Sequence, residues 1–299
     1  MAPPVPGAVS CLHEVSMRYE LLGPLRVSNG RESHLLSAPK METTLAVLLV
    51  GAGRVTTKNS LVLELWGDRP PRRAAAAIHV YISQLRKFLA AAAADPAGID
   101  PAGIDPAGID PAGIDPAGID PADIIVTKPS GYLLRLDGAS FDVTEFQDAM
   151  RDGRAQQAAG SYAAALSAAE RALSLVRGPV LAESAAEGPV LTAFAAWAEE
   201  ERLAALELSV EARTALGRHR EVISLLGALT AQYPLRESFY SQLMLVLYRA
   251  GRQAEALAVY RGAQQVLRAE LGLEPCRSLR RLHDAILTRD RLLDLPTAS

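Results

Sequence analysis

The feature that most constrains this chain is a pair of helical patterns separated by a loop that no helix can cross. Leu61, Leu65 and Trp66 fall on one face of a short helix, which Gly67 ends. Pro70 and Pro71 follow, and a proline inside a helix removes a hydrogen bond and clashes with the preceding turn. A second helical pattern then begins. The sequence therefore predicts two helices joined by a tight turn.

The second helix has an apolar side and a basic side. Its apolar residues recur at three- and four-residue spacing and are Ile78, Tyr81, Ile82, Leu85 and Leu89. A separate stripe is made of His79, Ser83 and Arg86, flanked by Lys87 and, at the helix start, by Arg72 and Arg73. This arrangement suits a helix that lies on a core while its outer face meets phosphates and base edges. A basic face can also be merely solvated, and Trp66 is expected in the core.

The segments before this pair predict a small sheet and one more helix. Residues 17–22, 25–28 and 34–36 have strand character, with a hairpin-type turn at Asn29-Gly30. Ser37 is expected to cap a helix that has Pro39 in its first turn. The predicted inward face of that helix carries Met41, Leu45, Leu48, Leu49 and Ala52, and Gly51 and Gly53 end it. Thr57 is expected to cap the helix that follows.

Two further strands follow the helices, at residues 124–127 and 132–136, joined by the turn Lys128-Pro129-Ser130-Gly131. They predict a hairpin with a basic tip. The full order is a small sheet, three helices and a hairpin. This is a winged helix-turn-helix with an N-terminal sheet, and the segment is similar to the DNA-binding domains of OmpR/PhoB-type response regulators. The third helix would enter the major groove, and the hairpin would reach the flanking backbone or minor groove.

A low-complexity segment separates the third helix from the hairpin. The unit Asp-Pro-Ala-Gly-Ile occurs five times in tandem over residues 95–119, and an altered copy follows at 120–124. It is interpreted as a disordered loop expansion, the alternative being an acidic contact surface. It also masks charge: residues 17–137 contain 13 Lys/Arg and 13 Asp/Glu, but seven of those acids lie within residues 95–123. The remaining 13 bases against 6 acids give the basic surface that DNA binding needs.

From Phe141 onward the pattern is helical. Asp142 and Glu145 predict a capping box for the first helix. Further helices are expected directly after Gly160, Gly217 and Gly251. Gly217 and Gly251 are 34 residues apart, which is the tetratricopeptide period. Such helix pairs form protein- or peptide-binding grooves. A helical block that packs on the DNA-binding domain and helps it dimerise is the other interpretation.

Composition narrows the class of protein. The chain has 299 residues, 49% of them hydrophobic and only 5% aromatic, which favours helices rich in alanine and leucine. Two cysteines, at positions 11 and 276, exclude a disulfide framework and fit a reducing compartment. Neither a signal peptide nor a membrane-spanning run is visible. A cytoplasmic location is expected, with no membrane partner.

Taken together, the chain resembles the Streptomyces antibiotic regulatory protein (SARP) family of transcriptional activators. The motifs that carry the likeness are Leu21-Leu22-Gly23-Pro24-Leu25, Leu65-Trp66-Gly67-Asp68-Arg69-Pro70-Pro71, Tyr81-Ile82-Ser83-Gln84-Leu85-Arg86-Lys87, Gly131-Tyr132-Leu133-Leu134 and Leu271-Gly272-Leu273-Glu274-Pro275. The resemblance implies a mainly α protein. It would have a flexible tail at 1–16, an OmpR/PhoB-type winged-helix domain (α+β) at 17–137 with an insertion at 95–123, and an all-α, tetratricopeptide-like bacterial transcriptional activation domain at 141–290.

The resemblance also implies partners and a role. Family members bind direct repeats in double-stranded DNA near the -35 element and recruit the RNA polymerase holoenzyme, through its sigma factor or its alpha or beta subunits. A homodimer on DNA is compatible with this. The residues expected to bind DNA are Thr57, Lys58, Arg72, Arg73, His79, Ser83, Arg86, Lys87, Lys128 and Ser130. The loop 67–71 is either only a turn or a polymerase contact, and the residues expected there are Trp66, Asp68, Arg69 and Pro70.

Two other classes of function compete with this one. One is an interaction scaffold, in which the helical repeats bind a protein and the winged domain is an adaptor; the basic helix face argues against it. The other is an enzyme. The sequence has no nucleophile elbow, metal-ligand cluster or phosphate loop. No catalytic residue, metal or cofactor is therefore expected. The missing phosphate loop also suggests a small standalone family member without an ATPase domain. A receiver domain before the winged domain, and with it aspartate phosphorylation, is not expected.

Overall fold

The computed structural model describes residues 17–36, 38–93, 124–179, 188–290 and 293. Their contacts form two compact units that interleave along the chain. Unit 1 takes residues 1–145 and 177–198, and unit 2 takes residues 146–176 and 199–299. The five-residue repeat and the N-terminal tail, for which disorder was expected, lie outside the described residues.

Among the described residues, unit 1 holds two small sheets, three complete helices and the N-terminal parts of two longer ones. Its elements are β1 (Arg18–Glu20), β2 (Arg26–Ser28), β3 (Ser33–His34), α1 (Pro39–Val50), β4 (Val55–Thr57), α2 (Lys58–Trp66), α3 (Ala74–Ala93), β5 (Ile125–Lys128), β6 (Gly131–Leu134) and β7 (Ser140–Phe141). One sheet has the order β3-β2-β1-β7, in which β7 is parallel to β1, and the other has the order β4-β6-β5 and is antiparallel. The winged-helix fold is confirmed, with two short strands, β4 and β7, beyond those predicted.

The helices of unit 1 bury the faces that the sequence predicted. The core includes Leu45, Leu48 and Leu49 from α1, Leu61 from α2, and Ile78, Ile82, Leu85 and Leu89 from α3. The hydroxyl of Thr57 accepts a hydrogen bond from the Ser60 amide at 3.1 Å, and Gly67 ends α2 with φ 56°. The cap predicted at Ser37 lies outside the described residues, and Ala38 precedes α1 without a side-chain cap. Leu65 and Trp66 are only half-buried.

The expected capping box at Asp142 and Glu145 takes a different form. The buried carboxylate of Asp142 accepts hydrogen bonds from the Leu21 and Leu22 amides at 2.8–2.9 Å. Glu145 pairs with the guanidinium of Arg18 at 2.8 and 2.9 Å. Burial raises the pKa of Asp142, and the two amides partly offset that rise. Asp142 therefore supplies acceptors for the amides that follow β1, while Glu145 pairs with a side chain at the first residue of that strand.

The helices from residue 142 onward confirm the predicted helical region. They are α5 (Asp142–Ala158), α6 (Tyr162–Leu175), α7 (Pro189–Ala215), α8 (His219–Gln232), α9 (Glu237–Arg249), α10 (Gln253–Leu271) and α11 (Arg277–Thr288). Gly160, Gly217 and Gly251, which connect successive helices, have φ values of 75°, 76° and 78°. Only glycine adopts this left-handed conformation without steric cost. The glycines therefore mark the helix turns, as predicted.

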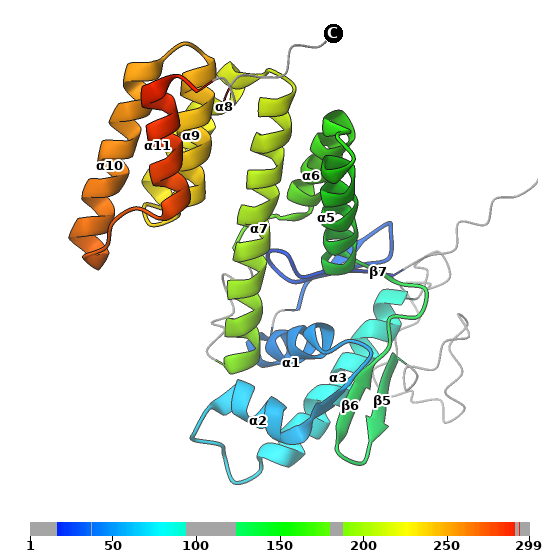
Figure 1. Cartoon of the computed structure of the whole chain (residues 1–299). Helices are drawn as coiled ribbons and strands as arrows, with labels where there is room; N and C mark the ends of the chain where they lie inside the picture. The colour runs from blue at the N-terminus through cyan, green and yellow to red at the C-terminus, as the bar shows by residue number, and fades with distance from the viewer. Residues whose placement is uncertain (1–16, 37, 94–123, 180–187, 291–292, 294–299) are drawn as a thin grey trace, which may run out of the picture. The chain divides into compact units, whose positions relative to one another are not determined.

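Unit 2 is held together by close helix packing. Within it, α9 packs against α8, α10 and α11, and Figure 1 shows these four helices as one group. Their shared core includes Leu226, Phe239, Met244 and Leu247. Gly153 of α5 allows a second close approach, since a Cβ there would lie 2.8 Å from Leu208 and 3.3 Å from Ala168. Small residues thus bring these helices together, as the alanine-rich pattern indicated. None of the helices in the described residues is long and apolar enough to cross a bilayer.

Candidate nucleic-acid interface

The outer face of α3 is a stripe of exposed side chains. Arg72 and Arg73 precede the helix, and the exposed residues from position 72 to position 87 are Arg72, Arg73, Ala75, Ala76, His79, Val80, Ser83, Gln84 and Lys87. Sequence reasoning missed Ala75, Ala76, Val80 and Gln84. Val80 is notable because it is 53% exposed on the basic side of the helix. The signal was available, because Val80 lies two residues from both Ile78 and Ile82 and so falls outside the apolar spacing of the helix.

Arg86, a predicted DNA-binding residue, is half-buried and contacts the hairpin. Its Nε and Nη2 donate to the Ile125 carbonyl oxygen at 3.0 and 2.5 Å, and Nη2 also donates to Thr127 Oγ1 at 2.8 Å. The planar guanidinium suits such a forked contact. Arg86 therefore fastens β5 to α3, and Figure 1 shows the β5–β6 hairpin beside that helix.

His79 makes a second link between α3 and the hairpin. Its Nδ1 lies 2.9 Å from the Tyr132 hydroxyl, and the two rings meet edge to face at 6.1 Å. Burial raises the pKa of Tyr132, an effect that the Arg86 charge partly offsets, so the phenol is neutral and can donate to the imidazole. Two of the predicted stripe residues, His79 and Arg86, thus hold the wing in place.

The tip of the wing lies next to the start of α2. The Lys58 amide donates to the Ser130 carbonyl oxygen at 3.2 Å. Gly131 pairs with Thr57 in the β4–β6 ladder, and a Cβ on it would lie 1.9 Å from the Thr56 carbonyl oxygen. This close approach allows only glycine. The structure therefore gathers four predicted residues, Thr57, Lys58, Lys128 and Ser130, at one edge of the winged domain.

The loop between α2 and α3 is exposed from residue 67 to residue 73. Trp66, at its base, is half-buried and stacks on Tyr81 of α3, with ring centroids 6.4 Å apart. The Lys40 ammonium lies 4.7 Å from the centre of the indole ring. Asp68, Arg69 and Pro70 therefore project from a base that aromatic stacking fixes.

Glu64 of α2 makes a buried contact that sequence reasoning missed. It is only 5% exposed, and its carboxylate accepts hydrogen bonds from the Val190 and Leu191 amides, both at 2.9 Å. These amides belong to the first turn of α7, which has no partners within its own helix. Gly188 leaves room for this cap, since a Cβ there would lie 2.2 Å from the Glu64 carboxyl carbon. An acid among apolar helix residues gives no sequence signal for such a contact.

The described residues contain no group of three or more His, Cys, Asp or Glu side chains that could hold a metal ion. Their polar chemistry is that of a basic surface built from one helix, one helix start and one hairpin. This arrangement can contact phosphates at several points and present short side chains to base edges.

Comparison with known proteins matches both parts of the chain. The family model "Transcriptional regulatory protein, C terminal" matches residues 32–101, and the model "Bacterial transcriptional activator domain" matches residues 141–287. The chain is 35% identical to the transcriptional regulator RedD of Streptomyces coelicolor over 94% of its own length and 73% of the relative. It is 32% identical to the regulatory protein DnrI of Streptomyces peucetius over 93% of its own length and 94% of the relative.

A solved structure shares the fold. It is Mycobacterium tuberculosis EmbR in complex with a low-affinity phosphopeptide, with a TM-score of 0.79 at 30% identity over 94% of this chain and 66% of that one. The chain also spans 26% of the regulatory protein AfsR of Streptomyces griseus. These matches describe a family of transcription regulators and not of enzymes. The chain belongs to the SARP family of DNA-binding transcriptional regulators, which join an OmpR/PhoB-type DNA-binding domain to a bacterial transcriptional activation domain.

Proposed function

We propose that this regulator activates an antibiotic or other secondary-metabolite gene cluster. In this proposal it binds direct repeats near the promoter -35 element, as two copies side by side, and recruits RNA polymerase. This proposal is supported by the chain's membership of the SARP family and by the sequence motifs that it shares with that family. The observation that carries the DNA-binding mode is the exposed stripe of α3, fixed to the hairpin by Arg86 and His79.

Arg72 and Arg73 fit phosphate contacts. They lie at the N-terminal end of α3, where the helix dipole is already positive and basic side chains are disfavoured unless an anion is near. Lys87 lies about 20 Å further along the helix, from a rise of about 1.5 Å per residue. Lys58 and Lys128 add contacts from the wing edge. In this proposal the basic residues hold the phosphates on either side of the groove.

Ser83, Val80 and Gln84 occupy the middle of the stripe and are proposed to face base edges. Their side chains are short or flexible, which allows the helix to lie deep in the major groove. Arg86 and His79 act as positioning residues in this proposal, because their polar atoms are engaged with the hairpin. Thr57 and Ser130 support the wing edge, where backbone amides and hydroxyls can reach phosphates.

Binding to a duplex that carries the direct repeats tests these roles. Lys87→Ala should weaken binding and reduce the slope of log K against log salt by about 1, because one phosphate contact is lost. Arg86→Ala should weaken binding while leaving that slope close to wild type, since its charge faces the hairpin. Arg261→Ala, an exposed arginine of α10, is the matched control. Equal binding by Lys87→Ala and Arg261→Ala would refute the assignment of α3.

The exposed loop before α3 is proposed to contact RNA polymerase. Arg69→Ala should leave promoter binding within about twofold of wild type, because Arg69 precedes the basic stripe. It should reduce activated transcription in a reconstituted system by about tenfold, the effect of losing one charged contact of about 1.4 kcal/mol. Footprinting of the promoter by wild type and by Arg69→Ala, with and without RNA polymerase, tests the same contact independently. Full activation by Arg69→Ala and by Asp68→Ala would contradict this contact.

A further inference from the structure

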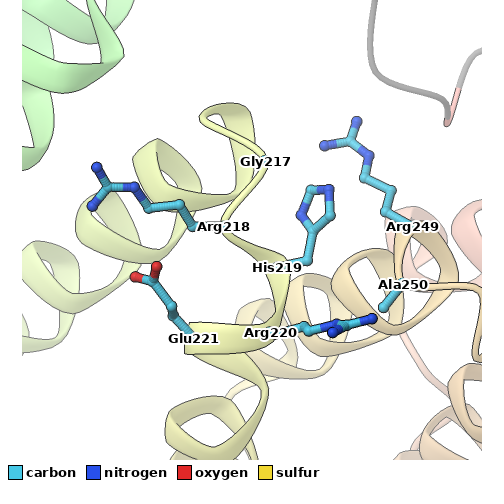
Figure 2. Close-up of a pocket in the computed structure, with 7 residues that line it drawn as sticks. All are labelled: Gly217, Arg218, His219, Arg220, Glu221, Arg249 and Ala250. Carbon is cyan, nitrogen blue, oxygen red and sulfur yellow. The ribbon is translucent and has the colours of Figure 1, made fainter.

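Unit 2 contains a basic cavity that the DNA-binding function does not use. It has a volume of about 340 Å³ and lies between the start of α8 and the end of α9. Its lining residues are Gly217, Arg218, His219, Arg220, Glu221, Arg249 and Ala250, drawn in Figure 2. Three arginines and one histidine thus face a single acid. The exposed side chains of Arg218 and Arg220 outnumber the one acid of the lining, Glu221.

One wall of the cavity is formed by His219 and Arg249. Figure 2 shows the imidazole and the guanidinium side by side, and burial followed by the Arg249 charge holds the pKa of His219 below its usual range. The Arg249 Nε donates to the Leu293 carbonyl oxygen at 2.8 Å, which fixes that side chain. Among the described residues, His219 Nδ1 is shielded from solvent and has no hydrogen-bond partner. A buried polar atom without a partner costs free energy unless a ligand or water supplies one.

The equivalent turn one repeat later provides an internal comparison. There Arg252 forms an ion pair with Glu255 at 2.6 Å, and Gln253 donates to the Ile286 carbonyl oxygen at 2.8 Å. At the first turn, Arg218 and Glu221 hold the matching positions, 34 residues earlier, but among the described residues they form no ion pair. Arg220 stands where the later turn has Ala254. The later turn neutralises itself, while the earlier one keeps its charge facing a cavity.

We propose that this cavity binds a phosphate group, either inorganic phosphate or a small phosphate monoester. Guanidinium groups match phosphate oxygens with two parallel hydrogen bonds, and His219 Nδ1 can supply a further one. The volume lies at the lower end of the range of small-molecule sites. The lining residues include no aromatic platform for a nucleobase, and the cavity is too narrow for a duplex. The ligand is therefore recognised by its phosphate.

Calorimetry on the full chain tests the proposal, with inorganic phosphate and ribose 5-phosphate as separate probes against chloride at equal ionic strength. Wild type should bind one equivalent of at least one probe. Binding of both would assign the site to free phosphate, and binding of ribose 5-phosphate alone would assign it to a monoester. Arg218→Ala and Arg220→Ala should each weaken binding by about tenfold, the loss of a charge-assisted hydrogen bond. Arg252→Ala, at the equivalent turn, should bind like wild type.

Two results would overturn the proposal. One is the absence of binding heat in wild type with either probe at about 10 mM, which is roughly ten times the dissociation constant of a weak site of about 1 mM. The other is that Arg252→Ala weakens binding of the phosphate probe as much as Arg220→Ala does. That result would mean that the overall positive charge attracts the probe and that the cavity does not bind it. The assay contains no DNA, so failure here leaves the proposed promoter binding untouched.

Discussion

Two buried acids of unit 1 each hold a pair of backbone amides from a distant part of the chain. Asp142 accepts from Leu21 and Leu22, and Glu64 accepts from Val190 and Leu191. A buried carboxylate is tolerated only when hydrogen bonds satisfy it, and removing such a partner leaves polar atoms stranded. Single residues of this kind define which segments belong to the winged unit.

Val80 leads to a prediction about base readout that rests on the proposed role of α3. An exposed valine in a polar stripe can contact the 5-methyl group of thymine. Replacing thymine by uracil, which lacks only that methyl, should weaken wild-type binding at one position of each repeat by about three- to tenfold, as expected for losing roughly one buried methyl group. Fluorescence anisotropy on a set of substituted duplexes measures this.

The matched variant Val80→Ala should bind more weakly than wild type and should no longer distinguish thymine from uracil at that position. Its own loss of affinity should equal the loss that wild type shows on the uracil duplex. A Val80→Ala variant that still discriminates would assign the methyl contact to another residue, such as Ala76.

At the scale of elements, alanine substitution of two glycines of unit 2 is expected to change the free energy of unfolding in opposite directions. Gly217→Ala should lower the free energy of unfolding by about 1 kcal/mol, because φ is 76° and an L-residue is strained there. Gly227, inside α8, has open space around its Cβ position and no positive φ. Gly227→Ala should therefore raise the free energy of unfolding by about 0.5–1 kcal/mol. Urea denaturation of both variants checks the pair; a shared sign would contradict the turn assignment.

The elements that could be predicted were those with a long apolar period. The helix that contains Ile78 repeats its apolar residues over several turns, and the strands around the Lys128 turn stand next to a clear turn signal. The strand Val55–Thr57 was missed because three residues give no period, and it forms only because Gly131 allows β6 to approach. Local sequence carries no information about such a long-range partner.

The candidate site shows the same limit. Sequence reasoning found the basic side of α3, since charges at helical spacing are visible in the chain. It could not show that Arg86 and His79 turn toward a hairpin some 40 or 50 residues away, because a helical wheel does not reveal what packs beside it. Glu64 was missed for the same reason.

For the whole molecule, the repeat leads to a deletion prediction. Deleting residues 95–119 leaves five residues between the end of α3 and Ile124, which can span about 17 Å. The end of α3 lies about 10 Å along the helix from Arg86, which contacts Ile125. The shortened loop therefore still closes, and the free energy of unfolding should rise by about 1–2 kcal/mol because loop closure costs less entropy.

Promoter affinity of the deletion variant should stay within about twofold of wild type, measured by the same anisotropy assay. The control is a variant in which residues 95–119 are scrambled, so that the length and the composition of the segment stay the same and only its residue order changes. Loss of DNA binding in the deletion variant, with binding kept in the scrambled one, would show that the wing needs the extra chain length.

The Glu64 cap also determines how this regulator can be recombined with its relatives. A chimera that exchanges the DNA-binding part at residue 137 would give α2 of one parent the α7 start of the other. If residues 177–198 are not exchanged together with the DNA-binding part, an acid at position 64 from one parent meets a glycine at position 188 from the other only by chance. The transferable module is thus two pieces of sequence, and exchange of promoter specificity should succeed only when both pieces come from one parent.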